Sequence, residues 1–76
     1  MAVKGYLLIE AKLGKADQVI KSADGMEGIV SIDKVSGSWD VIAVVTGESI
    51  KDIGELVVGK IRKIEGIEKT LTCFVV

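Results

Sequence analysis

The stretch Met26-Glu27-Gly28-Ile29 decides the fold, because it returns as Ile64-Glu65-Gly66-Ile67 half of the 76-residue chain later. At the same shift, the apolar spacing of a short helix predicted over residues 15–23 falls on that of a second helix beginning at Ser49. Each copy of the stretch leads into a strand-like segment. Two similar β-α-β halves predict an α+β chain of ferredoxin-like β-α-β-β-α-β order, with both helices on one face of a four-stranded antiparallel sheet.

The predicted strands are separated by turn and helix-start signals. The segments with strand periodicity are residues 3–11, 29–35, 39–46 and 67–76. Ser36-Gly37-Ser38 predicts a tight turn between the second and third strands, since glycine accepts a positive φ. Ser49, with Asp52 three residues later, is typical of a helix start. The second helix is expected to bury one apolar stripe, made of Ile50, Ile53, Val57, Ile61 and Ile64.

The predicted sheet has apolar residues on both faces, although the helices can cover only one. In the third strand, Val41, Ala43 and Val45 alternate with Ile42 and Val44, and in the first strand Tyr6 and Leu8 repeat the pattern. A helix-free face carrying such residues would expose a large apolar patch on a monomer. Packing the same face of a second copy against it, sheet on sheet, would remove that patch from water. We therefore expect an obligate homodimer, a dimeric α/β barrel.

Composition supports self-association and excludes several kinds of site. Apolar residues make up 49% of the chain, which is high for a domain near the lower size limit for folding alone. Cys73 is the only cysteine and histidine is absent, so we expect no disulfide, no metal site and no cofactor. Within its alternating strand, Cys73 is expected to be a small core residue.

Charge and hydropathy argue against nucleic-acid and membrane partners. The net charge is −1, from ten basic and eleven acidic residues, and the only dense basic group, residues 60–63, is expected to be a solvated helix face. No apolar run approaches about 18 residues, so neither a membrane span nor a signal peptide is predicted. A single reduced cysteine fits the cytoplasm. Many Ile, Val, Lys and Glu residues lean toward a thermophilic source.

Gly37-Ser38-Trp39-Asp40 is the best candidate for a binding element. A glycine turn exposes backbone amides that can hold a carboxylate, and Asp40 can hold an ammonium, so together they suit a zwitterion. Alternatively, Asp40 bonds backbone amides of the turn and Trp39 packs at an interface. Thr70 and Thr72 lie on one face of the last strand, where threonine is an ordinary strand former unless the face lines a cavity.

In order, these features resemble the effector-binding (RAM) domain of the Lrp/AsnC family of feast/famine regulators. The resemblance covers essentially the whole chain, with Trp39 where tyrosine is usual. The matching elements are Gly14-Lys15-Ala16, Gly37-Ser38-Trp39-Asp40, Ile64-Glu65-Gly66-Ile67 and Thr70-Leu71-Thr72.

The resemblance implies a mode of assembly and a site. In that family, two sheets pack into a dimer, dimers associate into rings such as octamers or decamers, and an amino acid binds between dimers. Nothing precedes the first strand where full-length members carry a helix-turn-helix domain. Residues 1–76 therefore resemble the stand-alone version, a single ligand-binding domain without direct DNA contact. The implied ligand contacts are Gly37, Ser38, Trp39, Asp40, Thr70 and Thr72.

These inferences favour an amino-acid sensor that acts by ligand-dependent oligomerisation or by co-assembly with full-length Lrp/AsnC regulators. One alternative is a scaffold that only oligomerises and binds no amino acid. The other is a small dimeric α/β-barrel enzyme, for which Tyr6, Glu10 and Asp40 are the only polar candidates inside the barrel. The absence of histidine, the commonest general base, disfavours the enzyme.

Overall fold

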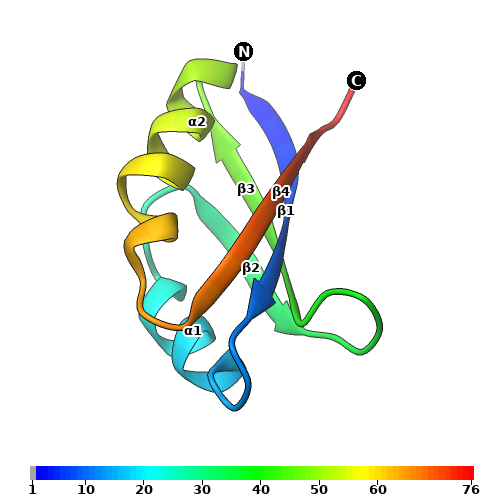
Figure 1. The fold of residues 1–76 in the computed structure, drawn as a ribbon. Helices are drawn as coiled ribbons and strands as arrows, with labels where there is room; N and C mark the ends of the chain where they lie inside the picture. The colour runs from blue at the N-terminus through cyan, green and yellow to red at the C-terminus, as the bar shows by residue number, and fades with distance from the viewer. Residues whose placement is uncertain (1) are drawn as a thin grey trace.

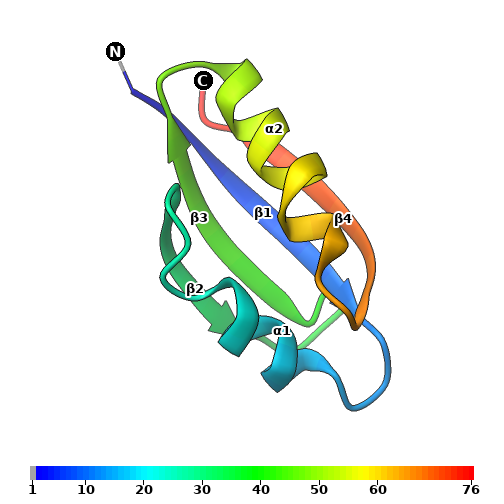
Figure 2. The ribbon, with the colours of Figure 1, turned by 90° about the vertical axis from the view of Figure 1, so that its left-hand side faces the viewer.

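The structure, a computed structural model, describes residues 2–76 and confirms the predicted β-α-β-β-α-β order. The four strands form one antiparallel sheet in the order β2-β3-β1-β4, and both helices lie on the same side of it (Figures 1 and 2). Within residues 2–76, neither helix is long and apolar enough to cross a membrane. The elements are β1 Val3–Ala11, α1 Ala16–Ala23, β2 Ile29–Lys34, β3 Val41–Gly47, α2 Ile50–Gly59, a 3₁₀ turn Ile61–Lys63, and β4 Ile67–Phe74.

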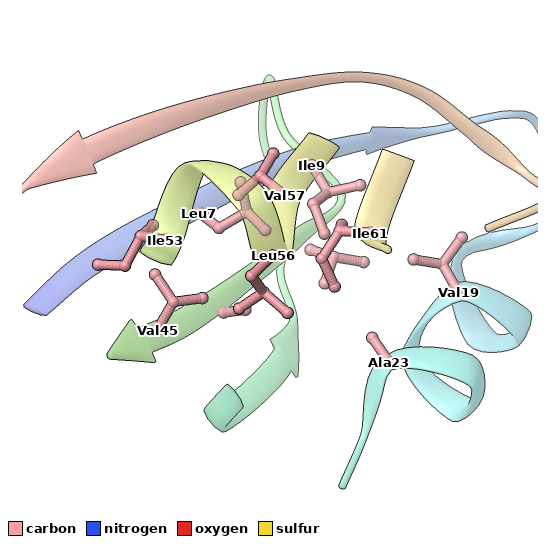
Figure 3. Packing of buried hydrophobic residues seen from close by; sticks show 11 residues of the cluster. Leu7, Ile9, Val19, Ala23, Val45, Ile53, Leu56, Val57 and Ile61 are labelled. Atoms are coloured by element: carbon pink, nitrogen blue, oxygen red, sulfur yellow. The ribbon is translucent and has the colours of Figure 1, made fainter. Parts of the chain in front are cut away.

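The core fills the space between the helices and one face of the sheet (Figure 3). Because strand residues alternate between faces, every second residue of the two central strands enters this layer. The described residues include no buried polar or charged side chain. The buried hydrophobic residues are Leu7, Ile9, Val19, Ala23, Val41, Ala43, Val45, Ile53, Leu56, Val57 and Ile61.

The start of α2 confirms one prediction and corrects another. Ser49 caps the helix as expected, since its Oγ accepts a hydrogen bond from the Asp52 amide at 3.2 Å. Ile50 was predicted to be buried, but it is 59% exposed, and Leu56 is buried in the helix instead. Ile50 is the first residue of α2, and Ile53, one turn later, is buried against β3, where a Cβ on Gly47 would lie 3.3 Å from its side chain.

The internal repeat is visible in the backbone at two glycines. Gly28 and Gly66 stand at equivalent points before β2 and β4, with φ of +96° and +103°. L-residues with a side chain rarely adopt such angles. Each glycine also lies against a helix of the other half: a Cβ on Gly28 would be 2.9 Å from Leu56, and one on Gly66 would be 2.8 Å from Lys15. The repeated Glu-Gly-Ile sequence thus marks two places where the chain turns tightly beneath a helix.

Candidate functional site

The connection between β2 and β3 is a wider loop than the predicted tight turn. It comprises residues 35–40, because β2 ends at Lys34 and β3 begins at Val41. At its base, the Val35 amide donates to the Asp40 carbonyl at 2.9 Å, and the Asp40 amide donates to the Ile9 carbonyl of β1 at 3.0 Å. The loop projects from the end of the sheet on the side away from the helices (Figure 1). It is therefore anchored at its base and open at its tip.

The tip of this loop offers backbone groups to a ligand or a partner. Gly37 has φ of +121°, and a Cβ placed there would meet nothing within 4 Å. Ser36 and Ser38 on either side of it are exposed. A loop with free backbone amides and two hydroxyls beside a glycine can hydrogen-bond an anionic group such as a carboxylate.

Asp40 stabilises the end of β1 by accepting a hydrogen bond from a backbone amide. The second of the two interpretations of Asp40 predicted this kind of contact. Its Oδ2 accepts a hydrogen bond from the Ala11 amide at 2.8 Å. The β1–β4 register shifts between Glu10 and Ala11, and at this irregularity the carboxylate of Asp40 satisfies the Ala11 amide. The predicted partner was an amide of the turn itself, whereas the observed one comes from another strand.

The same carboxylate opens onto a hollow at the end of β1. The hollow has a volume of about 500 Å³. Across it, Lys34 forms an ion pair with Asp17 at 3.2 Å, with both side chains largely exposed. Oδ1 of Asp40 makes no hydrogen bond to the described residues, so one oxygen remains for a ligand. The charged residues around the hollow are Glu10, Lys12, Asp17, Lys34 and Asp40.

Trp39 connects the loop to the far edge of the sheet. It is half-buried, and the Nζ atom of Lys69 lies 5.5 Å from the centroid of its ring. Lys69 stands in β4 directly opposite Glu10 of β1, so the contact spans from the β2–β3 loop to the edge strand. Lys69 was not among the predicted site residues. Its lysine-over-indole contact joins segments far apart in the sequence, and no local motif indicates it.

Thr70 and Thr72 lie on the opposite face of the sheet from Lys69. They pair with Ile9 and Leu7 of β1, whose side chains point into the core, and both threonines are half-buried. The 500 Å³ hollow is lined by Asp40 but by neither threonine. One copy of residues 2–76 therefore does not bring the predicted contacts around a single cavity. Their joint role in ligand binding stays a prediction.

The helix-free face of the sheet carries a continuous apolar patch, here called the open face. Tyr6 lies opposite Val44 on one side and Cys73 on the other, and Leu8 lies likewise between Ile42 and Leu71. Tyr6 and Leu71 are 41% and 48% exposed. Neither helix covers this surface, because both lie on the other side of the sheet (Figures 1 and 2). The open face comprises Tyr6, Leu8, Ile42, Val44, Leu71 and Cys73.

The placement of Cys73 corrects the sequence prediction of a core residue. Its thiol belongs to the open face, and the residue is exposed in the chain. Register is the reason: Phe74 pairs with Gly5 and Thr72 with Leu7 on the core side, which leaves Cys73 opposite Tyr6 on the other. No cluster of three or more histidine, cysteine or carboxylate side chains suited to a metal occurs within residues 2–76.

The fold and these surfaces define a small ferredoxin-like domain with one face packed by helices, one apolar face open and a glycine loop at the sheet end. Residues 4–76 match the family model described as the Lrp/AsnC ligand-binding domain. The chain therefore belongs to the Lrp/AsnC ligand-binding domain family, which confirms the resemblance seen in the sequence.

Known proteins agree with this assignment. An uncharacterized HTH-type transcriptional regulator of Pyrococcus furiosus is 30% identical over 57 residues, which cover 75% of this chain and 35% of the relative. The chain thus spans about a third of that relative's length. FFRP-DM1, a solved structure, superposes with a TM-score of 0.91 at 27% identity, covering 97% of this chain and 99% of that one.

A more distant solved structure shows the same fold at lower identity. The transcriptional regulator NMB0573 of Neisseria meningitidis, solved in complex with L-Met, superposes with a TM-score of 0.86 at 12% identity. The match covers 97% of this chain and 49% of that one. At this identity, the likeness concerns the fold.

Proposed function

We propose that this domain binds an amino acid and regulates transcription through its assembly, with its own effector site completed by a second pair of chains. The observation that supports the proposal best is that the candidate site is divided within one chain. The glycine loop and Asp40 lie at one end of the sheet, whereas Thr70 and Thr72 lie on the helix-covered face of the edge strand β4. A site completed by a neighbouring copy makes ligand binding and assembly one equilibrium.

The open face supports a homodimer as the basic unit of this assembly. A second copy placed face to face would cover Tyr6, Leu71 and the Cys73 thiol, which are exposed in a single chain. Such dimers would then associate into rings such as octamers or decamers, bringing the loop of one dimer near the last strand of another. Co-assembly with full-length Lrp/AsnC regulators is the output that we propose, in keeping with the regulatory family.

The proposed role is binding rather than catalysis. The family is one of transcription regulators, and one oxygen of Asp40 already accepts from the Ala11 amide. A net charge of −1 supports action through a partner regulator rather than through direct DNA contact. We place the domain in the cytoplasm with its partner, where an unpaired cysteine stays reduced.

The NMB0573 complex supports an amino acid as the ligand class, since that regulator shares the fold and was solved with L-Met. Titration calorimetry with a panel of the common amino acids, combined with sedimentation velocity, tests the proposal. We expect at least one amino acid to bind and to shift the distribution of oligomers. A dimer that binds no amino acid at millimolar concentration would leave the scaffold alternative instead.

Two substitutions separate the structural role of Asp40 from its proposed role in ligand binding. Asp40→Asn keeps an oxygen that can accept from the Ala11 amide but removes the charge. We expect its stability to change by less than about 1 kcal/mol, while affinity for the amino acid falls roughly tenfold, because a hydrogen bond to a charged group is worth more than a neutral one.

Asp40→Ala serves as the comparison. It removes the acceptor as well and leaves the part-buried Ala11 amide unpaired, so we expect an added loss of about 1–2 kcal/mol in the free energy of unfolding. Urea denaturation and calorimetry on the two variants measure both quantities. Equal affinity in Asp40→Asn and the unmodified protein would remove Asp40 from the ligand site.

A further inference from the structure

We propose that Lys69 is a positioning residue that holds Trp39, and through it the glycine loop, in the conformation that receives the ligand. This inference rests on the proposed function, because it assigns a residue that controls the same loop. It concerns a contact between β4 and the loop, in which Nζ of Lys69 lies 5.5 Å from the centroid of the Trp39 ring.

Within residues 2–76 and apart from this contact, the loop is held to the sheet only at its base. Its hydrogen bonds to the sheet are at the base, where Val35 bonds the Asp40 carbonyl and Asp40 bonds Ile9 and Ala11. Between these, residues 36–38 are exposed, and Gly37 has open space around it. Among residues 36–39, Trp39 is the half-buried one, so its packing decides where the tip of the loop lies.

Lys69 lies over the Trp39 ring and not beside the carboxylate opposite it in the sheet. In the β1–β4 register, Lys69 lies directly opposite Glu10, the carboxylate with which a cross-strand ion pair would be expected. Within the described chain, the ammonium of Lys69 makes no ion pair within 4.0 Å and lies over the indole instead. Tryptophan is the best aromatic partner for a cation, and the contact leaves Glu10 facing the hollow that Asp40 also lines.

The contact is worth little energy. A cation–π contact at an exposed site is weak, and its loss lowers the equilibrium constant for docking of the loop by about two- to fivefold. If only the docked loop receives the ligand, the apparent affinity falls by up to the same factor, because affinity scales with the fraction of competent molecules. Lys69 thus acts on binding without needing to contact the ligand.

The chain provides its own probe and its own control. Trp39 is the only tryptophan, so indole fluorescence reports on the loop alone. Lys4 lies over Tyr6 in a similar contact, 5.4 Å from the ring centroid, at the other end of the sheet. Lys4→Met therefore repeats the chemical change of Lys69→Met on the same type of contact, away from the loop.

The experiment compares Lys69→Met, Lys69→Arg and Lys4→Met in the full chain. We expect Lys69→Met to shift Trp39 emission to longer wavelength, to increase acrylamide quenching, and to lower the affinity for the amino acid found by the calorimetric panel by up to about fivefold. Lys69→Arg, whose guanidinium also stacks on indole, should restore both properties. Lys4→Met should leave both unchanged.

Fluorescence without ligand separates this proposal from the proposed function. Quenching that is the same in Lys69→Met and the unmodified protein would overturn the role of Lys69 whether or not an amino acid binds. Increased quenching with unchanged affinity would also overturn it, since the loop would then move without consequence for the ligand. If no amino acid binds the unmodified protein, the proposed function fails, and the role assigned to Lys69 in ligand binding fails with it.

Discussion

Leu71→Glu is expected to convert the protein from a dimer into a folded monomer. Leu71 lies in the open face opposite Leu8 and is 48% exposed in one chain. A glutamate there is readily hydrated in the monomer, but in a face-to-face dimer each copy would have to bury a carboxylate among apolar side chains. That penalty is several kcal/mol for an unpaired charge, so we expect the dimer dissociation constant to rise by more than about a hundredfold.

Sedimentation equilibrium and the reactivity of Cys73 measure this change in independent ways. The thiol is the only one in the chain and lies in the same face, so the dimer should protect it from a thiol reagent and Leu71→Glu should expose it. Val58→Glu is the matched control, because Val58 is 61% exposed on helix α2, in the layer away from the open face. An unmodified protein that sediments as a monomer, with rapidly reacting Cys73, would contradict the proposed assembly.

The sequence was sufficient for the fold because its two halves repeat the same local signals. The Glu-Gly-Ile repeat predicted two equivalent strand starts, and Gly28 and Gly66 confirm them with similar positive φ angles. The alternation of residues in β1 and β3 also predicted a sheet with apolar residues on both faces. These signals are local and periodic, so they need no knowledge of pairing between strands.

The errors came from features that depend on pairing. Strand β4 has apolar residues in both phases, with Phe74 in one and Leu71 and Cys73 in the other, so alternation could not tell which phase enters the core. The register with β1 decides it and places Cys73 outside. Ile50 follows the helical spacing, but its exposure depends on where the helix first meets the sheet.

The loop of the candidate site could be predicted from the sequence, but the residues that the loop contacts could not. Gly37, Ser38 and Asp40 were identified from turn chemistry, and the structure shows the loop to be open at the sheet end. The Ala11 amide, which donates a hydrogen bond to the Asp40 carboxylate, is 29 positions away in the sequence. The Lys69 ammonium near Trp39 comes from another strand, so no spacing rule indicates either partner.

Gly66→Ala is expected to cause the largest loss of stability among the glycine substitutions, about 3 kcal/mol. Two costs add at this position. A φ of +103° lies outside the angles that alanine accepts readily, which costs about 1–3 kcal/mol. The new Cβ would also lie 2.8 Å from the Lys15 Cβ, an atom fixed to the backbone at the start of α1 and unable to rotate away. The chain must shift there, although the Gly66 carbonyl accepts from the Lys12 amide at 2.7 Å.

Two other glycines provide a graded comparison in the same experiment. Gly28→Ala has a similar φ, and its Cβ would meet a terminal methyl of Leu56 at 2.9 Å and the Thr46 carbonyl at 3.3 Å. Because the nearer atom is the end of a side chain, the loss should be smaller than at Gly66. Gly54→Ala lies inside α2 with nothing within 4 Å and should stabilise the protein by about 0.5–1 kcal/mol. Urea denaturation of all three at one protein concentration tests this order, since the stability of a dimer depends on concentration. Equal losses at Gly66 and Gly28 would show that backbone strain alone, and not the contact with helix α1, determines the requirement for glycine.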